Sequence, residues 1–323
     1  MTLKEIQAPL NKHLDKFNVL FRETMKSRAP LLNTITRYIV KPKGKQMRPL
    51  FVFLSAELCG EISEKTYRAA ALIELLHTAT LIHDDVVDDS NERRGFFSLN
   101  ALWKNKISVL VGDYLLSRGM LLSVENNDHD LLKIVSNSVK VMSEGELLQM
   151  EKARKLDIKE EIYFEIIRQK TASLIASCFA CGAASAGASE EIISKLYSIG
   201  ENIGMAFQIK DDLIDLENTK RSGKPSGVDI KERKLTLPLI FLLNNSSYLE
   251  KRKILRIVKK HNHNEEKVDR LITLVKEKGG IDYAEQKMDE YKNLAISGLN
   301  MMPECKARES LKALVEFTIT RSS

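Results

Sequence analysis

The sequence predicts an all-α fold, a single-domain bundle of about ten or more helices. Apolar residues recur with helical spacing from one end of the 323-residue chain to the other. Gly (15), Pro (7) and aromatic residues (6%) are few, whereas Leu, Ile, Ala, Lys and Glu are plentiful, which favours helices over strands. The 43% hydrophobic and 29% charged residues are ordinary for a globular protein that buries a sizeable core.

Helix boundaries are predicted at short polar or Gly-containing breaks. Ser63, Ser189 and Pro303 are typical of helix starts, and Gly187 and Gly279 of helix ends. The breaks are expected at residues 41–45, 60–63, 90–98, 126–130, 157, 187–189, 218–229, 244–247, 261–264, 279–280 and 302–303. None of them has the length or composition of an interdomain linker, so we expect one domain, 1–323.

Charge and cysteine usage narrow the class of protein. The formal charge is only +6, and Lys and Arg alternate with Asp and Glu, so no basic and aromatic platform predicts a nucleic-acid partner. The excess positive charge indicates anionic small substrates or an anionic lipid surface. The four cysteines form no disulfide framework and the N-terminus has no signal-peptide pattern, so we expect a cytoplasmic protein. No stretch is expected to be apolar enough to span a bilayer.

Two predicted helices, 67–89 and 199–215, carry an apolar stripe that ends in aspartates. The first cluster is Asp84, Asp85 and Asp88, and the second is Asp211, Asp212 and Asp215. Within each, the first and last aspartates are four residues apart and share a helix face. Mg²⁺ suits such carboxylates, because it takes one or two of them and completes its shell with water and phosphate oxygens. Two such helices facing each other would form a cavity with an apolar throat; the alternative is two solvated acidic helix ends.

Basic residues accompany both acidic clusters. Arg93 and Arg94 follow the first cluster, Lys224 and Lys234 follow the second, and Lys45 and Arg48 precede both. Acidic groups with a metal and Arg or Lys bind diphosphate, since the metal bridges its oxygens and guanidinium groups add bidentate hydrogen bonds. Lys45 and Arg48 could hold a second anion without metal. Taken singly, each of these residues would be an ordinary surface charge.

The ordered motifs closely resemble the trans-polyprenyl diphosphate synthase family over roughly residues 41–241. They are Gly44-Lys45-x-x-Arg48-Pro49, His77, Asp84-Asp85-x-x-Asp88, Arg93-Arg94-Gly95, Gly112-Asp113, Lys170-Thr171, Phe207-Gln208-x-x-Asp211-Asp212-x-x-Asp215, Gly223-Lys224-x-x-Gly227-x-Asp229 and Lys234-x-Thr236-Leu237-Pro238. The resemblance implies the isoprenoid synthase fold, in which helices surround a central cavity. It also implies a homodimer, and leaves open a peripheral membrane contact for product release.

The resemblance also implies roles for individual residues. Asp84, Asp88 and Asp211, supported by Asp85, Asp212 and Asp215, are implied to hold more than one Mg²⁺ on the allylic diphosphate. Its cationic contacts would be Arg93, Lys170, Lys224 and Lys234, and the isopentenyl diphosphate site would comprise Lys45, Arg48, His77 and Arg94. Thr171 and Gln208 would face the developing allylic cation with their oxygens.

The implied reaction lengthens an allylic diphosphate, such as farnesyl diphosphate, by condensation with isopentenyl diphosphate. The allylic C–O bond ionises, the isopentenyl double bond attacks the cation, and a proton is lost. Stabilising charge where it develops is the main catalytic effect in such a site. In this family the released diphosphate is thought to take the proton, so no side-chain base is assigned.

Two small residues predict a long product. Ala79 and Thr80 lie about one helical turn, ~5.4 Å, before Asp84. Short-chain members typically carry an aromatic residue there, so small side chains resemble the long-chain quinone side-chain synthases, octaprenyl diphosphate synthase above all, with about six to eight or more isoprene units. Tyr114, Met120 and Leu121 are candidates for a deeper floor, and Ala79 could also be only a tight helix contact.

Other functions remain as alternatives. A short-chain geranylgeranyl or farnesyl diphosphate synthase would share every motif except the open floor. His77, His83 and Asp84 could instead indicate a His-Asp metal phosphohydrolase, although that leaves the second cluster and the lysines without a role. A class I terpene cyclase would replace the second cluster with an Asn/Asp-Ser/Thr-Glu triad, and a non-catalytic partner subunit would typically lose one cluster.

Overall fold

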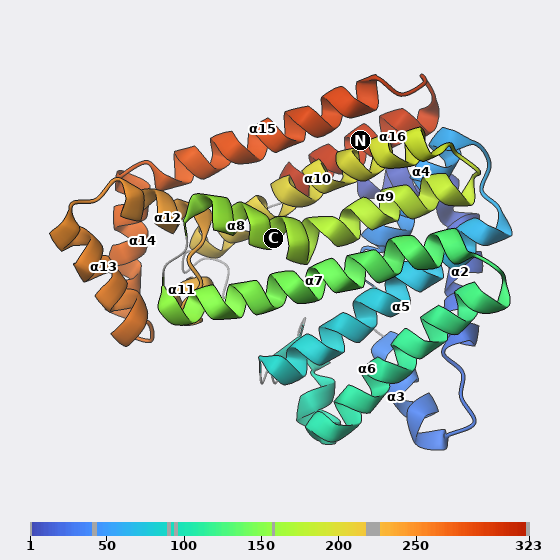
Figure 1. The fold of residues 1–323 in the computed structure, drawn as a ribbon, viewed down its shortest axis with the longest axis horizontal. Coiled ribbons are helices and arrows are strands. Elements are labelled where there is room, and N and C mark those ends of the chain that lie inside the picture. The colour runs from blue at the N-terminus through green and yellow to red at the C-terminus, as the bar shows by residue number, and fades with distance from the viewer. Residues whose placement is uncertain are drawn as a thin grey trace. The chain divides into compact units, whose positions relative to one another are not determined.

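The computed structural model describes residues 2–40, 44–88, 92–93, 96–156, 159–217 and 227–320. Over these ranges the chain is helical apart from one pair of two-residue strands, so the predicted all-α class is confirmed (Figure 1). The strands, β1 (Glu92–Arg93) and β2 (Phe96–Phe97), pair antiparallel.

The helices follow one another with short connections. They are α1 (Leu3–Gln7), η1 (Ala8–Leu10), α2 (Asn11–Thr24), α3 (Pro30–Val40), α4 (Met47–Cys59), α5 (Glu64–Val87), α6 (Leu99–Glu125), α7 (His129–Lys155), α8 (Glu160–Ile167), η2 (Arg168–Ala172), α9 (Ser173–Ser185), α10 (Glu190–Glu217), α11 (Val228–Lys231), α12 (Leu237–Asn244), α13 (Tyr248–Lys260), α14 (Glu265–Glu277), α15 (Gly280–Asn300) and α16 (Lys306–Thr320). Lengths of 20 residues and more in α5, α6, α7, α10 and α15 are typical of helices buried along one side.

The chain forms two compact units, each assembled from separate stretches. Unit 1 comprises Met1–Val139, Ser177–Tyr197 and Met302–Ala313, and unit 2 comprises Lys140–Ala176, Ser198–Met301 and Leu314–Ser323. Asp84, Asp85 and Asp88 belong to unit 1, and Asp211, Asp212 and Asp215 belong to unit 2. The single domain over 1–323 stays a prediction.

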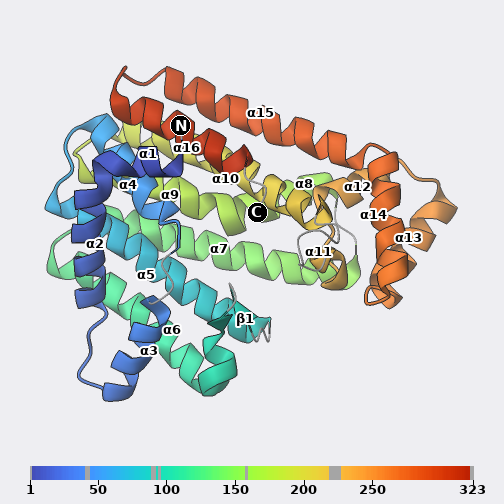
Figure 2. The ribbon, with the colours of Figure 1, turned by 180° about the vertical axis from the view of Figure 1, so that it is seen from behind.

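In unit 1, α5 packs along α6 and contacts α4 and α2 (Figures 1 and 2). Ala69, Ala70 and Ala71 are fully buried in α5, so its neighbours approach closely. Gly119 of α6 lies against Leu72, where an added Cβ would come within 3.1 Å of the leucine. Small residues therefore set the spacing of these helices.

In unit 2, α12 packs against α15 at the start of the latter. Gly280 has no side chain because an added Cβ would lie 2.6 Å from the carbonyl oxygen of Pro238. Phe241 and Tyr283 then stack with ring centroids 4.5 Å apart. The apolar segment of α12 is almost completely buried by these contacts.

Most predicted helix boundaries that fall in the described ranges are confirmed. Ser63 and Ser189 immediately precede α5 and α10, and Gly187 and Gly279 adopt positive φ values of 78° and 79° after helices. The predicted start at Pro303 is wrong, because turn and bend residues continue and α16 begins at Lys306. The predicted breaks at 41–45, 90–98, 157 and 218–229 lie partly or wholly outside the described residues.

The expectation that no stretch is apolar enough to span a bilayer is wrong. Within the described residues, α6 is long enough and apolar enough, with a mean hydropathy of 1.4, to cross a bilayer by length and composition. A core helix of a soluble protein passes the same test, and α6 packs on α5 through Gly112 and Gly119. The expectation failed because Lys104, Lys106 and Glu125 lie toward the ends of this helix, which leaves Asp113 and Arg118 as the charged residues between them.

Candidate active site

The first aspartate cluster lies at the C-terminal end of α5. Asp85 is buried at 4% exposure, Asp84 is half-buried, and Asp88 is exposed and caps the helix, with its N–H donating to the Asp84 carbonyl oxygen at 2.8 Å. Carboxylates are unfavourable at a helix C-terminus, where the macrodipole is already negative. This end of α5 therefore favours a bound cation.

His83 is held by α6 beside this cluster. Its Nε2 lies 3.3 Å from the Val109 carbonyl oxygen and 3.4 Å from Asp113 Oδ1. Gly112 makes room for the ring, since an added Cβ would lie 2.2 Å from His83 Nε2. The Gly112-Asp113 motif thus holds His83, the residue before Asp84, in place. It does not itself supply metal ligands.

The residues predicted to bind isopentenyl diphosphate are only partly among the described residues. Arg48, at the start of α4, is half-buried with Nη1 3.8 Å from Glu74 Oε2 on α5, and Lys45 is exposed. His77 is half-buried on α5, one turn beyond Glu74. Arg94 lies outside the described residues, as does the side chain of Arg93, which contributes its backbone to β1.

The second cluster is connected to its surroundings by named hydrogen bonds within unit 2. Asp212, buried at 5% exposure on α10, accepts from the Tyr163 hydroxyl at 2.8 Å and from Gln208 Nε2 at 2.9 Å. Gln208 Oε1 in turn accepts from the Thr171 hydroxyl at 2.7 Å. Four residues from α8, η2 and α10 therefore form one continuous chain.

Lys170 and Thr171 lie on η2, a π-helical turn, in which the Ser173 N–H donates to the Arg168 carbonyl oxygen. Such turns widen a helix and often occur at functional sites. Two glycines let neighbouring helices reach it. An added Cβ at Gly145 of α7 would lie 2.7 Å from Gln169 Cβ, and one at Gly204 of α10 would lie 2.4 Å from Ala172 Cα. Gln208 lies one turn after Gly204, which brings its amide to Thr171.

Lys170 has partners on α7. Its Nζ donates to Gln149 Oε1 at 2.9 Å and forms an ion pair with Glu146. About 31% of the Lys170 side chain is exposed, so the ammonium is accessible to an anion. The ion pair keeps a long, flexible side chain in one place until that anion competes for it.

Asp215 holds the segment that begins at Gly227. Its Oδ1 accepts from the Val228 N–H at 3.0 Å and its Oδ2 from the Asp229 N–H at 3.2 Å. Gly227 adopts φ 68°, a left-handed conformation that suits glycine, and donates its N–H to the Asp215 carbonyl oxygen. Lys234 Nζ lies 4.0 Å from Asp229 Oδ1, and Lys224 lies outside the described residues.

Burial raises the pKa of three carboxyl groups here: Asp212, Asp215 and Asp229. For Asp212 and Asp229 the charge of a neighbouring aspartate raises the pKa further, whereas the bonds from Gln208 and Tyr163 lower that of Asp212. Crowded, partly desolvated carboxylates are stabilised by a cation. In the described part of the chain, no group of three or more His, Cys, Asp or Glu side chains could hold a metal ion by itself. Mg²⁺ needs only one or two carboxylates when phosphate oxygens complete its shell, so the aspartates of the second cluster fit it.

The sequence profile described as polyprenyl synthetase matches residues 29–275. The chain belongs to this family. It is 34% identical to the all-trans-nonaprenyl-diphosphate synthase (geranyl-diphosphate specific) of Rhodobacter capsulatus over 98% of both chains. It is 33% identical to the octaprenyl diphosphate synthase of Escherichia coli over 99% of both.

A solved structure agrees with these matches. A decaprenyl diphosphate synthase from Rhodobacter capsulatus superposes with a TM-score of 0.94 at 33% identity, covering 100% of each chain. A short chain isoprenyl diphosphate synthase of Methanothermobacter thermautotrophicus is also 33% identical, over 99% of each chain. The chain is thus a prenyltransferase of the polyprenyl synthetase family, its relatives at 33–34% identity include long-chain and short-chain synthases, and the phosphohydrolase alternative is not supported.

The residues predicted to limit chain length occupy different environments in this polyprenyl synthetase. Ala79 is fully buried, and Thr80 is half-buried with its hydroxyl donating to the His77 carbonyl oxygen at 2.9 Å. The Tyr114 hydroxyl donates to the Lys26 carbonyl oxygen at 2.9 Å. Met120 and Leu121 are 50% and 44% exposed in the single chain, so neither forms a buried floor there.

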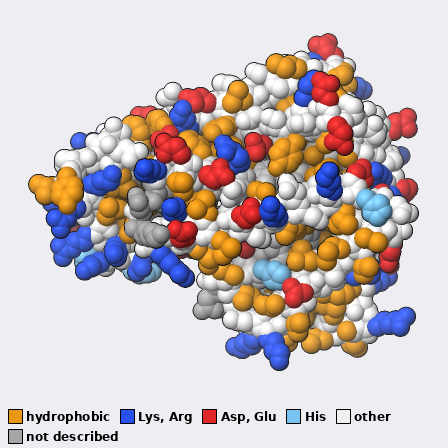
Figure 3. Space-filling view, viewed as in Figure 1, with side chains coloured by type: hydrophobic (Ala, Val, Ile, Leu, Met, Phe, Trp, Pro, Cys, Tyr) orange, Lys and Arg blue, Asp and Glu red, His pale blue; other side chains and the backbone are white. Residues whose placement is uncertain are grey.

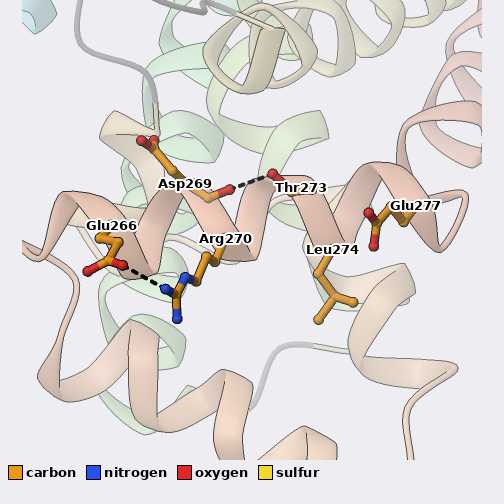
Figure 4. A pocket seen from close by; sticks show the side chains of 6 residues that line it. All are labelled: Glu266, Asp269, Arg270, Thr273, Leu274 and Glu277. Atoms are coloured by element: carbon orange, nitrogen blue, oxygen red, sulfur yellow. Dashed lines mark hydrogen bonds and ion pairs between the residues drawn. The ribbon is translucent and has the colours of Figure 1, made fainter.

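A shallow hollow elsewhere takes none of the predicted site residues. It is lined by residues of α14 in unit 2: Glu266, Asp269, Arg270, Thr273, Leu274 and Glu277 (Figure 4). Arg270 Nη2 pairs with Glu266 Oε1 at 2.6 Å, and Asp269 and Glu277 leave the hollow with a net negative charge. A hollow made by one helix with an internal ion pair offers no site for a diphosphate.

Sequence reasoning missed several residues that build the second site. Tyr163 was not singled out, nor were the close-contact glycines Gly145 and Gly204 or the Lys170 partners Glu146 and Gln149. None belongs to an acidic or basic motif. Tyr163 precedes Phe164 on an amphipathic helix, and such a pattern predicts an ordinary core residue. No local signal in the sequence could therefore have identified Tyr163.

Proposed function

We propose that this enzyme elongates an allylic diphosphate such as farnesyl diphosphate by repeated condensation with isopentenyl diphosphate, and that it releases a long-chain polyprenyl diphosphate for quinone side-chain synthesis. The observation that carries the proposal is the hydrogen-bond chain that joins the second aspartate cluster to Thr171 and Gln208. Membership of the polyprenyl synthetase family and the two D-D-x-x-D clusters support it.

In this proposal each charged group lowers the energy of the departing diphosphate. Asp84, Asp88 and Asp211 would hold Mg²⁺, which when bound neutralises the phosphate oxygens and helps the leaving group depart. Lys170, which precedes Thr171, and Lys234, 4.0 Å from Asp229, would add positive charge, and Arg93 and Lys224 would do the same from outside the described side chains. Lys45, Arg48, His77 and Arg94 would bind isopentenyl diphosphate without metal.

The oxygens of Thr171 and Gln208 would then face the carbon that becomes positive. Both are part-buried on helices and fixed by hydrogen bonds, so they need not reorganise during the reaction. Asp85, Asp212 and Asp215 support the arrangement instead of binding metal. The released diphosphate would take the proton lost from the product, as the family resemblance implies, so no protein base is assigned.

One assay tests the reaction and its metal dependence. Purified protein is incubated with farnesyl diphosphate and radiolabelled isopentenyl diphosphate, with Mg²⁺ or with EDTA, and the products are dephosphorylated and sized by chromatography. We expect products of six to eight or more isoprene units with Mg²⁺ only. Products of three or four units would establish the short-chain alternative, and phosphate release without isopentenyl diphosphate would indicate a phosphohydrolase.

Product length is proposed to depend on the residues one turn before Asp84. Ala79 is fully buried, so a large residue there risks strain, whereas Thr80 is half-buried and has more room. Thr80→Tyr is therefore expected to shorten the product while the protein stays folded. Thr78→Tyr, on the same helix but off the Asp84 face, is the control, and an unchanged product length in Thr80→Tyr would contradict the floor argument.

A homodimer is part of the proposal, and α6 is the surface that supports it. Large apolar side chains are exposed along one side of this helix: Val109, Leu110, Met120, Leu121 and Val124. Figure 3 shows hydrophobic side chains along α6 on the face in view. An apolar stripe of this kind marks a protein interface. Met120→Glu is expected to convert a dimer into a monomer in sedimentation experiments, and a monomeric wild type would contradict the proposal.

A cytoplasmic location with transient membrane contact is also proposed. Six Lys and Arg side chains are exposed on α13, which begins with exposed Tyr248 and Leu249, and Figure 3 shows basic side chains gathered over α13 and α14. Each such cation contributes about 1 kcal/mol near anionic lipid. Binding to vesicles containing phosphatidylglycerol but not to phosphatidylcholine alone would support this contact, and equal behaviour with both would contradict it.

A further inference from the structure

The side chain of Tyr163 lies at one end of the chain of hydrogen bonds in unit 2. It belongs to α8, is 4% exposed and donates its hydroxyl proton to Asp212 Oδ2 at 2.8 Å. The other oxygen of Asp212 accepts from Gln208 Nε2 at 2.9 Å. Both oxygens of this buried carboxylate are thus engaged by side chains of the protein. The role of Asp212 in this arrangement is to be held and to orient, and not to reach a ligand.

Asp212 sets the direction of the two bonds that follow, and Tyr163 holds its carboxyl group in place. Its Oδ1 accepts from Gln208 Nε2, so the NH₂ group of Gln208 points toward Asp212. Its carbonyl oxygen Oε1 then faces Thr171, 2.7 Å away, and the Thr171 hydroxyl must donate its single proton to it. Any third group near Thr171 Oγ1 therefore meets lone pairs alone. Such an oxygen stabilises a nearby positive charge, because its proton points away from that charge.

We propose that Tyr163 is a positioning residue that, through Asp212 and Gln208, fixes Thr171 Oγ1 as a pure acceptor toward the allylic carbon that becomes positive. This inference rests on the proposed function, because it assigns a substrate charge to the group that Thr171 faces. Tyr163 itself touches neither substrate nor metal. Its effect is expected on the chemical step and not on the binding of either diphosphate.

The simplest test removes one hydroxyl group. Tyr163→Phe is expected to lower kcat by about 10- to 100-fold, the effect of losing one hydrogen bond to a charged group. KM for farnesyl diphosphate and for isopentenyl diphosphate is expected to change by less than about 3-fold. Calorimetric binding of farnesyl thiodiphosphate with Mg²⁺ is expected to change equally little, which gives a readout besides turnover.

Tyr283→Phe is the matched control. This tyrosine lies in the same unit, packs on Phe241 and donates its hydroxyl to Glu160 Oε1 at 2.5 Å, but it has no bond to the second cluster. A structural role alone would lower the melting temperature of both variants alike and leave kcat alike. If Tyr163→Phe and Tyr283→Phe have the same kcat, or if Tyr163→Phe loses affinity with kcat unchanged, the inference is wrong.

Coupling between residues tests the route of the effect. Gln208→Met removes the amide that transmits the orientation, so adding Tyr163→Phe to it is expected to cost less than about 3-fold more in kcat. Full multiplication of the two losses would show that Tyr163 acts by another route and would overturn the inference. Far-UV circular dichroism and thermal unfolding of each variant accompany the kinetics.

Asp212→Asn keeps the shape of the site and covers the case in which Tyr163→Phe does not fold. The hydroxyl of Tyr163 can still donate to the remaining oxygen, which turns the new amide toward Gln208 and reverses the bond to Thr171. The kcat is expected to fall at least as far as in Tyr163→Phe, with thiodiphosphate binding within about 3-fold. An unchanged kcat would overturn the inference. A wild type without Mg²⁺-dependent elongation would instead defeat the proposed function, so the two failures are distinguishable.

Discussion

The two aspartate clusters share one spacing but differ in what their side chains already do. In the second cluster, Asp212 is held by Tyr163 and Gln208, and Asp215 caps the N–H groups of Val228 and Asp229. In the first, the last aspartate, Asp88, is exposed at the end of α5. The middle aspartate is buried in both. The same motif thus supplies outward-facing carboxylates in one place and mainly structural ones in the other.

Spacing alone therefore does not assign metal ligands. The prediction that Asp84, Asp88 and Asp211 hold metal, with the other three in support, agrees with the exposure of Asp88 and with the occupied oxygens of Asp212 and Asp215. It remains a prediction.

The largest effect is expected from the proposed metal ligands. Asp84→Asn and Asp211→Asn each replace a charge with an amide of the same shape and are expected to lower kcat by about 10²–10³-fold, as removal of other charge-stabilising groups does. Initial rates at saturating Mg²⁺ measure this. A smaller loss in both variants than in Asp215→Asn would reverse the assigned roles.

The next effect is on stability. Asp215→Ala leaves the backbone N–H groups of Val228 and Asp229 without their acceptor, at a cost of about 1–3 kcal/mol, which lowers the melting temperature by several degrees. Glu191→Ala serves as the control, because this residue of the same helix pairs with Lys195 at the exposed surface, where an ion pair contributes little to stability. Equal thermal unfolding of the two variants would contradict the capping role.

A smaller effect is expected from crowding beside the second cluster. Gly204→Ala brings a methyl group to 2.4 Å from Ala172 Cα, so α10 and η2 must separate, at a cost of about 1–3 kcal/mol. Separation weakens the bond between Thr171 and Gln208, so kcat falls together with stability. Gly187→Ala tests backbone strain instead, since it has open space but a positive φ. If Gly204→Ala kept full activity, the close approach would have no catalytic consequence.

The smallest effect is the pH dependence of the metal-free protein. The raised pKa values of Asp212, Asp215 and Asp229 mean that the folded protein holds protons that the unfolded chain has released. Folding stability from these groups is therefore present at low pH and lost as the pH rises through the folded values, from about pH 4 upward. Thermal unfolding in EDTA at several pH values measures the slope, and Asp212→Asn is expected to flatten it. A slope of opposite sign near neutral pH would contradict the raised values.

The sequence predicted the features that depend on neighbours along the chain. Helix starts at Ser63 and Ser189 and the left-handed glycines after helices follow from local capping, and the four-residue spacing of the aspartates follows from helix geometry. Pro303 failed as a helix start because a proline at this point fits equally well in the turn that precedes α16.

The features that depend on tertiary contacts could not be predicted. Tyr163 lies 49 residues before Asp212, and only the packing of α8 on α10 brings the two together. Gly145 and Gly204 matter because η2 lies against them, which no spacing in the chain reveals. The exposure of Met120 and Leu121 was likewise unpredictable, since an apolar helix gives no sign of which side its neighbours leave open.

The number of bound metal ions shows which aspartates are ligands. Electron paramagnetic resonance of Mn²⁺ with farnesyl thiodiphosphate gives the number of ions held by the wild type and by single Asp→Asn variants. We expect more than one ion in the wild type, fewer after substitution of Asp84 or Asp211, and an unchanged number after substitution of Asp212 or Asp215. Loss of an ion with Asp212 or Asp215 but not with Asp84 or Asp211 would contradict it.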